Sequence, residues 1–156
     1  METRNSLMFD AEELMNDFKK TIKQAFKTDE WINTFDGNEV KVVTKQERTS
    51  DKFPVISLNI IDDSPYNRTR DSNQVANHTQ FTLRITIYNK ESKNKKLDRE
   101  VLSRRIANEI IYNLQIKYGL SHQYNQPTPN EDVSIARRTI GYTSIIDNKT
   151  KAIFIQ

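Results

Sequence analysis

The sequence predicts an α+β domain with a single, mostly antiparallel β-sheet and two main helices packed on one face. Residues 81–88 alternate between apolar and polar side chains, which is the period of a half-buried strand. Residues 97–114 then carry apolar side chains at helical spacing, mostly along one stripe, and Gly119 stands where a left-handed cap is expected. Because each segment has one apolar side, the two can cover each other. The expected element order is α-β-β-β-α-β-β.

The first helix is expected from Asp10 to about Thr28. Asp10 and Glu13 have the spacing of a capping box, which satisfies backbone N–H groups at a helix start. Leu14 and Phe18 begin an apolar stripe along one side of this helix. The helix should therefore pack this stripe against the sheet.

Two strands should follow the first helix. Residues 31–38 are predicted to be a link that closes on the turn signal Asp36-Gly37-Asn38. Residues 40–43 and residues 53–60 are rich in β-branched side chains, and we expect these two strands to pair antiparallel.

The segment from 62 to 79 is predicted to be a long polar loop. It contains Tyr66, Arg68 and Arg70 but few apolar side chains. Loops longer than about 12–15 residues are uncommon in compact domains and are usually functional or disordered. We therefore expect this loop to be a docking element for a partner.

The C-terminal part is expected to form two further strands. Residues 121–132 should be a surface loop, and residues 133–146 are rich in β-branched side chains. Gly141 in this strand indicates a bulge or a close approach of another group. Residues 147–150 should form a hairpin turn that leads into residues 151–155.

Composition limits the class of protein. The chain has 156 residues, of which 35% are hydrophobic and 29% charged, and we expect one domain over residues 1–156. It has no cysteine, which excludes disulfides, thiolate metal sites and cysteine nucleophiles. No segment is apolar enough to span a bilayer and no signal peptide is recognisable, so we expect a cytoplasmic origin and no membrane partner. The net charge of +3 is too small to argue for nucleic acid.

Residues for catalysis or metal binding do not form a recognisable pattern. His78 and His122 are far apart in sequence and have no ligand at metal-site spacing, so we expect both in solvated loops. Asp62, Asp63 and Asp71 could converge on Mg²⁺, but in a segment rich in Ser, Pro and Asn they are predicted to be turn residues. Three glycines leave no room for a phosphate-binding loop. We therefore expect no enzyme, no metal and no cofactor.

Basic and aromatic side chains are the stronger candidates for function. Tyr66, Arg68 and Arg70 share the long loop, and Arg84 and Tyr88 lie on the polar side of the central strand. Such residues are enriched at protein interfaces, although Arg and Tyr also grip phosphate and stack on bases. Protein contact is the favoured interpretation.

Further cationic residues are weaker candidates. The four lysines between residues 90 and 96 are expected to be solvated. Arg137 and Arg138 are adjacent on a predicted strand, so they should point to opposite faces and cannot form one patch alone.

Several segments together resemble a known family. They are Phe53-Pro54 opening a strand, the Pro65-Tyr66 loop with its Arg and Asp, residues 80–88, the Ser92–Lys96 link, and the ending from Pro129-Asn130 through Ile135-Ala-Arg137 to Tyr142–Asp147. In pattern and order they resemble the tail-terminator, or tail-completion, proteins of the neck of long-tailed bacteriophages and phage-like particles. The resemblance covers most of the chain from Phe53 on. The long, Asn-rich loop at 62–79 and the polar lead before the first helix depart from it.

This resemblance implies a structural virion protein of the tail and neck, assembled in the host bacterial cytoplasm. Its copies would form a ring, typically a hexamer, that caps the head-proximal end of the tail tube and stops tube growth. The implied partners are other copies of the chain, the tail tube protein, head–tail connector or adaptor proteins, and DNA passing through the lumen. A head-completion or connector adaptor of the same neck, a small nucleic-acid-binding accessory domain and a small hydrolase remain as alternatives.

Two expectations concern packing. Phe18, Leu83, Ile85, Ile106 and Ile110 should be buried together. The opposite side of the central strand, with its Thr, Arg and Tyr residues, should face away from the helices.

Overall fold

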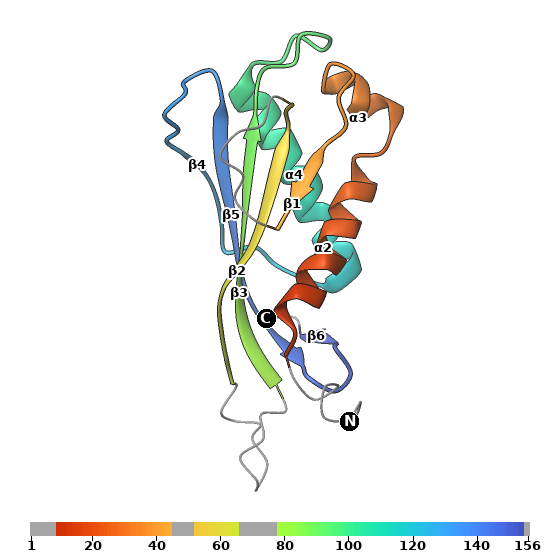
Figure 1. Cartoon of the computed structure of the whole chain (residues 1–156), viewed down its shortest axis with the longest axis vertical. Coiled ribbons are helices and arrows are strands. Elements are labelled where there is room, and N and C mark those ends of the chain that lie inside the picture. The colour runs from red at the N-terminus through yellow and green to blue at the C-terminus, as the bar shows by residue number, and fades with distance from the viewer. Residues whose placement is uncertain (1–8, 45–51, 66–77, 155–156) are drawn as a thin grey trace, which may run out of the picture.

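A computed structural model describes residues 9–44, 52–65 and 78–154 (Figure 1). The elements in chain order are α2 (Ala11–Ala25), α3 (Asp29–Thr34), β1 (Lys41–Val43), β2 (Val55–Pro65), β3 (His78–Asn89), α4 (Arg99–Tyr118), β4 (Tyr124–Thr128), β5 (Ala136–Asp147) and β6 (Ile153–Phe154). The predicted α+β class is confirmed, and α3 and β4 are additions to the predicted order.

The strands form one sheet in the order β1-β2-β3-β5-β4, with β6 paired to the end of β5. All the neighbouring pairs are antiparallel except β1 and β2, which are parallel, with Lys41 opposite Val55 and Val43 opposite Ser57. The prediction that these two strands pair antiparallel is therefore wrong. Their side chains suit either direction, and the direction depends on the path of the chain between them.

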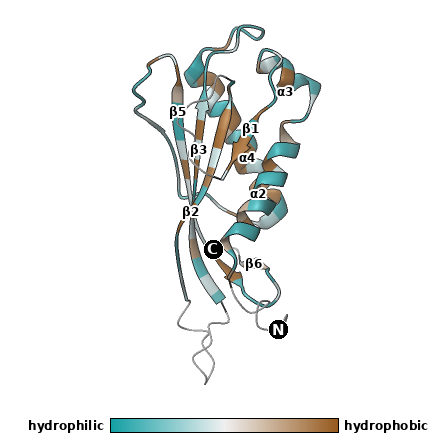
Figure 2. Cartoon of the chain, viewed as in Figure 1, coloured by the Kyte–Doolittle hydropathy of each residue, from teal (hydrophilic) through white to brown (hydrophobic). Residues whose placement is uncertain are grey.

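Helices α2 and α4 both cover one face of the sheet (Figure 1). Phe18, Leu83, Ile85, Ile106 and Ile110 have no exposed surface and belong to one core cluster, which confirms their predicted burial. Hydrophobic positions run through the central strands, and the outward side of α2 is largely hydrophilic (Figure 2). Within the described ranges, no helix combines the length and apolar character needed to cross a membrane.

Side-chain caps define where α2 and α3 begin. The Glu13 N–H donates to Asp10 Oδ1 at 3.1 Å, as the capping box predicts. The helix stops at Ala25 instead of continuing to about Thr28. Thr28 Oγ1 accepts the Trp31 N–H at 3.2 Å and caps α3, which lies partly in the segment predicted to be a link.

Helix α4 also has a cap at each end. Asp98 Oδ1 accepts the Val101 N–H at 2.8 Å. Gly119 has φ 71°, and its N–H donates to the Gln115 carbonyl at 2.9 Å, which confirms the predicted left-handed cap.

The segment 121–132, predicted to be a surface loop, contains the edge strand β4. Tyr124 of β4 stands opposite Gly141 of β5. A Cβ atom at Gly141 would overlap the Tyr124 ring, so the predicted close approach at this glycine is confirmed. The register of β5 against β3 is continuous through Gly141, and no bulge occurs there.

Strand β5 begins at Ala136, three residues after the predicted start. The preceding residues form a turn in which the Ser134 N–H and Oγ donate to Asp132 Oδ1 at 2.9 and 2.7 Å. These hydrogen bonds lower the pKa of the Asp132 carboxyl, the side-chain bond having the larger effect. The turn residues are therefore held out of the strand.

The segment from 62 to 79 is not all loop. Strand β2 continues through Pro65, and β3 already begins at His78, with Pro65 opposite Thr79. A register shift lies between Ile60 and Asp62. The polar residues at both ends of the predicted loop join the hydrogen-bonded ladder, although they lack the alternation that marks a half-buried strand.

Candidate functional site

The open face of the sheet, opposite the helices, carries most of the exposed polar strand residues. The register places these residues in three rows that run across the strands. The middle row consists of Ser57, Thr86, Thr139 and Gln126. On one side of it lies the row of Asn59, Arg84, Gly141 and Tyr124, and on the other side lies the row of Val55, Tyr88, Arg137 and Thr128. Because Leu83, Ile85 and Ile87 point into the core, the predicted orientation of β3 is confirmed.

A shallow cavity of about 360 Å³ lies on this face. It is lined by Thr44, Ser57, Asn59, Arg84, Thr86, Tyr88 and Arg137. Pockets that hold small ligands start at a similar volume, about 300 Å³. The lining combines hydroxyl and amide groups with two guanidinium groups, which is a chemistry suited to oxygen acceptors such as carboxylate or phosphate.

Arg137 is the most constrained cation of the open face. Its guanidinium carbon lies 5.8 Å from the centroid of the Tyr88 ring, a cation–π geometry. Its Nε atom is buried and has no hydrogen-bond partner in the described part of the chain. Arg84, two rows away on the same face, is exposed. Among the described residues, the buried Nε–H of Arg137 therefore has no acceptor.

The charge of this face has one sign over its middle. No carboxylate stands on it between Val55 and Asn59 of β2, between Thr82 and Tyr88 of β3, or between Arg137 and Thr143 of β5. The two arginines therefore create a local positive potential.

Arg138 lies on the other face, beside α4, as the alternation of a strand predicts. Its Nη1 atom donates to Asn125 Oδ1 at 3.1 Å. Burial lowers the pKa of the Arg138 guanidinium, Arg104 lowers it further, and Glu100 opposes the shift. The guanidinium remains charged, because even a lowered arginine pKa lies far above neutral pH.

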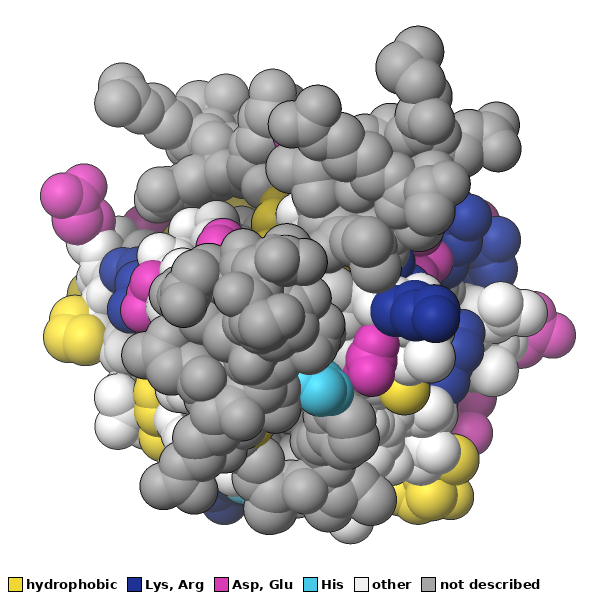
Figure 3. Space-filling model, turned by 90° about the horizontal axis from the view of Figure 1, so that it is seen from below, with side chains coloured by type: hydrophobic (Ala, Val, Ile, Leu, Met, Phe, Trp, Pro, Cys, Tyr) yellow, Lys and Arg dark blue, Asp and Glu magenta, His cyan; other side chains and the backbone are white. Residues whose placement is uncertain are grey.

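The β2 extension, which we define as residues Ile61–Pro65, is a second surface of interest. Strands β2 and β3 continue in Figure 1 past the helical layer, and all five residues of the extension are exposed. Asp62 stands opposite Thr82 and Asp63 opposite Phe81, so both are strand residues and the prediction of turn residues is wrong. Neither carboxylate forms an ion pair with another described residue. Charged side chains of both signs surround this end of the molecule (Figure 3).

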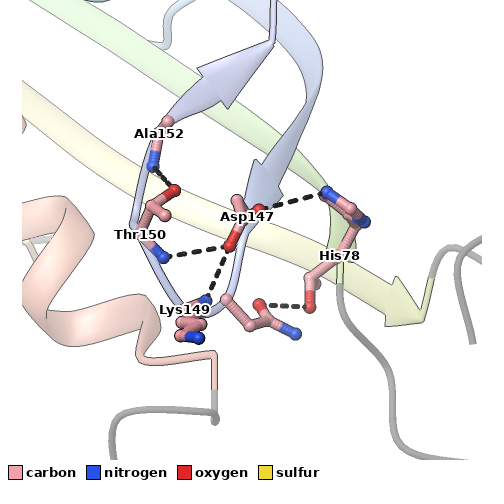
Figure 4. A network of polar contacts seen from close by, with 7 residues as sticks. His78, Asp147, Lys149, Thr150 and Ala152 are labelled. Carbon is pink, nitrogen blue, oxygen red and sulfur yellow. Dashed lines mark hydrogen bonds and ion pairs between the residues drawn. The ribbon is translucent and has the colours of Figure 1, made fainter. Parts of the chain in front are cut away.

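A polar network lies near the extension, at the end of β5 (Figure 4). Asp147 Oδ1 accepts the N–H groups of Lys149 at 2.8 Å and Thr150 at 2.9 Å, and Asp147 Oδ2 lies 3.3 Å from His78 Nε2. The pKa of the Asp147 carboxyl is lowered, chiefly by the Thr150 N–H, with smaller contributions from Lys149 and His78. His78 was predicted in a solvated loop, but it begins β3 and contacts this turn. The network fixes the predicted 147–150 hairpin turn.

The predicted site residues fall into two groups. Arg84 and Tyr88 lie together on the open face, and the structure adds Arg137, which the sequence interpretation treated only as a strand arginine. Tyr66, Arg68 and Arg70 lie outside the described residues, as does Asp71. His122 is exposed, as expected.

A larger cavity of about 500 Å³ lies where α3, β2, β3 and the start of α4 meet. Several of its polar groups are already engaged by the protein. Asp36 accepts the N–H groups of Lys93 at 3.1 Å and Asn94 at 2.8 Å, and Lys90 Nζ lies 5.1 Å from the centroid of the Phe53 ring. The open face is the better candidate, because no described carboxylate pairs with its two arginines. In the described residues, no group of three or more acidic or histidine side chains is placed to hold a metal ion.

Comparisons with known proteins find little. No protein-family model and no curated protein match this sequence. A solved structure, the sheath/tube terminator of the extracellular contractile injection system PVC in its extended state, is similar over 96% of this chain at 9% sequence identity, with a TM-score of 0.39. This chain spans 61% of the length of that protein. A likeness this remote does not establish a shared function.

Proposed function

We propose that this chain is a structural subunit that assembles into a ring and caps the end of a tail tube in a phage or phage-like particle. In this role it performs no catalysis and needs no cofactor. A ring, with six copies as the expected number, would stop tube growth at the head-proximal end and offer a surface to the head connector. DNA would pass through the lumen, and the assembled protein would be found in the virion after assembly in the bacterial cytoplasm.

Support comes first from the resemblance in pattern and order to tail-terminator proteins. The observation that carries the proposal is that the chain has two unlike surfaces available for contact: the cationic open face over the middle of the sheet and the acidic β2 extension at its end. A ring forms when one patch of a subunit binds a different patch of the next subunit and the rotation closes. Two unlike patches on one small chain suit this kind of assembly.

The first test is the mass of the assembled species. Native mass spectrometry of the purified chain should show a closed oligomer, with six times the 18.3 kDa mass of the chain as the expected value. Negative-stain electron microscopy should show rings of that stoichiometry. Deletion of the gene that encodes this chain should give tail tubes of uncontrolled length that lack heads. A chain that stays monomeric at every concentration, and whose removal leaves tube length unchanged, would refute the proposal.

A nucleic-acid role is the second candidate, because Arg84, Arg137 and Tyr88 could hold phosphate and stack on a base. This role predicts binding of single-stranded or duplex DNA that weakens steeply as salt concentration rises. Ring formation without such binding would favour the structural role.

A further inference from the structure

We propose that two copies of this chain pair through the outer side of α4, with the two helices antiparallel around a twofold axis. The α4 outer stripe, as we define it, consists of five exposed residues: Val101, Arg105, Asn108, Tyr112 and Ile116. The inference goes beyond the proposed function. A twofold contact uses the same patch on both copies, so it gives a dimer or joins two rings, but it cannot close a ring by itself.

Helix α4 carries apolar side chains on two opposite sides. On its inner side, Ile106 and Ile110 have no exposed surface. Three of the five large apolar side chains that the described residues expose also lie on α4, namely Val101, Tyr112 and Ile116, which are 39%, 63% and 70% exposed. A helix on the surface of a lone domain needs only one apolar side. The second apolar side therefore indicates a further contact.

Helix α2 shows how a solvated outer side looks in the same chain. Its exposed side chains are all polar: Glu12, Glu13, Asn16, Asp17, Lys20, Lys23 and Gln24. The α4 outer stripe has no lysine and no carboxylate, and combines Tyr112 and Arg105 with two aliphatic side chains. Tyrosine and arginine are enriched at protein interfaces, whereas lysine and glutamate are depleted there. The composition of the stripe is therefore that of an interface.

The spacing of the stripe indicates that its partner is a second copy. Positions 101, 105, 112 and 116 are separated by steps of four, seven and four residues, which read the same in both directions along the helix. When a second α4 runs antiparallel, with Val101 opposite Ile116, Arg105 therefore stands opposite Tyr112. Asn108 then lies next to the twofold axis. A parallel pair would instead place the two copies of Arg105 against each other.

The contact at Arg105 favours this arrangement chemically. A hollow of about 390 Å³ lies beside the stripe and is lined by Glu30, Trp31, Thr34, Arg105, Asn108 and Glu109. Tyr112 of the second copy would lie over Arg105 at the wall of this hollow, where its ring can stack on the guanidinium. Glu109 of the second copy would lie within one helical turn of the same arginine. No described carboxylate of its own chain pairs with Arg105.

The mass of the chain in solution tests the pairing. Sedimentation analysis over a range of concentrations should show a dimer with twice the 18.3 kDa mass of the chain. Ile116→Lys should weaken this dimer by about a hundredfold or more, because both copies lose a buried isoleucine side chain. Gln24→Lys is the matched control, since it adds the same charge to the exposed side of α2 and should leave the association unchanged. Circular dichroism melting should show that both variants fold.

Cross-linking tests the antiparallel arrangement, and the chain has no cysteine of its own to interfere. A mixture of Val101→Cys and Ile116→Cys proteins, treated with a short bismaleimide, should give cross-linked pairs that contain one of each. Neither protein alone should cross-link, because the two copies of position 101 would lie about 22 Å apart along the helix axes. Asn108→Cys alone should cross-link, because this position lies next to the twofold axis.

Other outcomes overturn the inference. If the unmodified chain is monomeric, or if Ile116→Lys associates as strongly as the unmodified chain, the pairing is wrong; rings of six that persist in Ile116→Lys would then still support the proposed function. Cross-linking of Val101→Cys alone would contradict the antiparallel arrangement. If Ile116→Lys keeps its mass in solution but no longer attaches to tail tubes, the stripe binds another protein instead. A dimer that Ile116→Lys abolishes, without rings under any condition, would support the pairing and count against the proposed function.

Discussion

Replacing Gly141 by alanine should show how closely β4 packs over β5. An added Cβ atom would overlap the Tyr124 ring at Cε1 and Cζ and would lie 2.7 Å from the tyrosine hydroxyl oxygen. Each of these distances is shorter than real Cβ contacts. The ring must therefore move off the open face, or β4 must shift against β5.

The expected effect is the difference between two terms. Overpacking costs about 1–3 kcal/mol. Alanine itself is favoured over glycine within a strand by about 0.5–1 kcal/mol. We therefore expect Gly141→Ala to lower the free energy of unfolding by up to about 2.5 kcal/mol, equivalent to a fall in Tm of up to about 10 °C for a chain of this size.

Two backgrounds at Tyr124 make the test specific. In Tyr124→Val the ring is absent, so Gly141→Ala should be neutral or slightly stabilising. In Tyr124→Phe both overlapping ring atoms remain, so the loss should persist. Urea denaturation of the single and double variants gives the coupling energy, expected at about 1–3 kcal/mol. An equal loss in all three backgrounds would refute the explanation, because the ring would then not be the obstacle.

Three further predictions concern the core and the β5–β6 turn. Tyr142→Phe should raise the free energy of unfolding by about 1–2 kcal/mol in urea denaturation, because the tyrosine hydroxyl is buried without a hydrogen-bond partner in the described residues. Burial also raises the pKa of this hydroxyl. A loss of stability would indicate that the hydroxyl has a partner. Ile85→Asp should abolish cooperative melting followed by circular dichroism, whereas Ile85→Val should cost only about 0.5–1.5 kcal/mol; a cooperatively melting Ile85→Asp protein would disprove the packing of β3 against the helices. Asp147→Asn should lower Tm at neutral pH, because the N–H groups of Thr150 and Lys149 favour the carboxylate and depress the pKa of Asp147 below its ordinary value of 3.8. A depressed pKa stabilises the fold above the pKa of the unfolded chain, so the difference in Tm should shrink as pH falls through 3.8 and below, and a difference independent of pH would contradict this explanation.

The sequence predicted the core well because its signals are local. The alternation along β3 and the stripe on α4 assign a burial to each residue without knowledge of its partner. Helix caps are equally local, since Asp10 and Gly119 act within one turn of their helices. These features therefore emerged from neighbouring residues alone.

The candidate site was only partly predictable. Alternation placed Arg84 and Tyr88 on the polar side of β3, where the structure has them. It also assigned Arg137 and Arg138 to opposite faces, but not which of them joins Tyr88. That choice depends on the register between β3 and β5, which are separated in sequence by α4 and β4. Asp62 and Asp63 were predicted to lie in a loop, because a polar edge strand lacks the apolar–polar alternation that marks a half-buried strand.

The sequence by itself determined that the apolar stripes of its two main helices and of β3 are buried, that Asp10 and Gly119 cap those helices, and that one face of its sheet is polar. The tertiary structure alone decided that β1 runs parallel to β2, that β4 joins the edge of the sheet, and that β2 continues past the helices. The physical reason is that burial and capping depend on residues close in the chain. Strand direction, register and extent depend on backbone hydrogen bonds to segments that only the folded chain brings together.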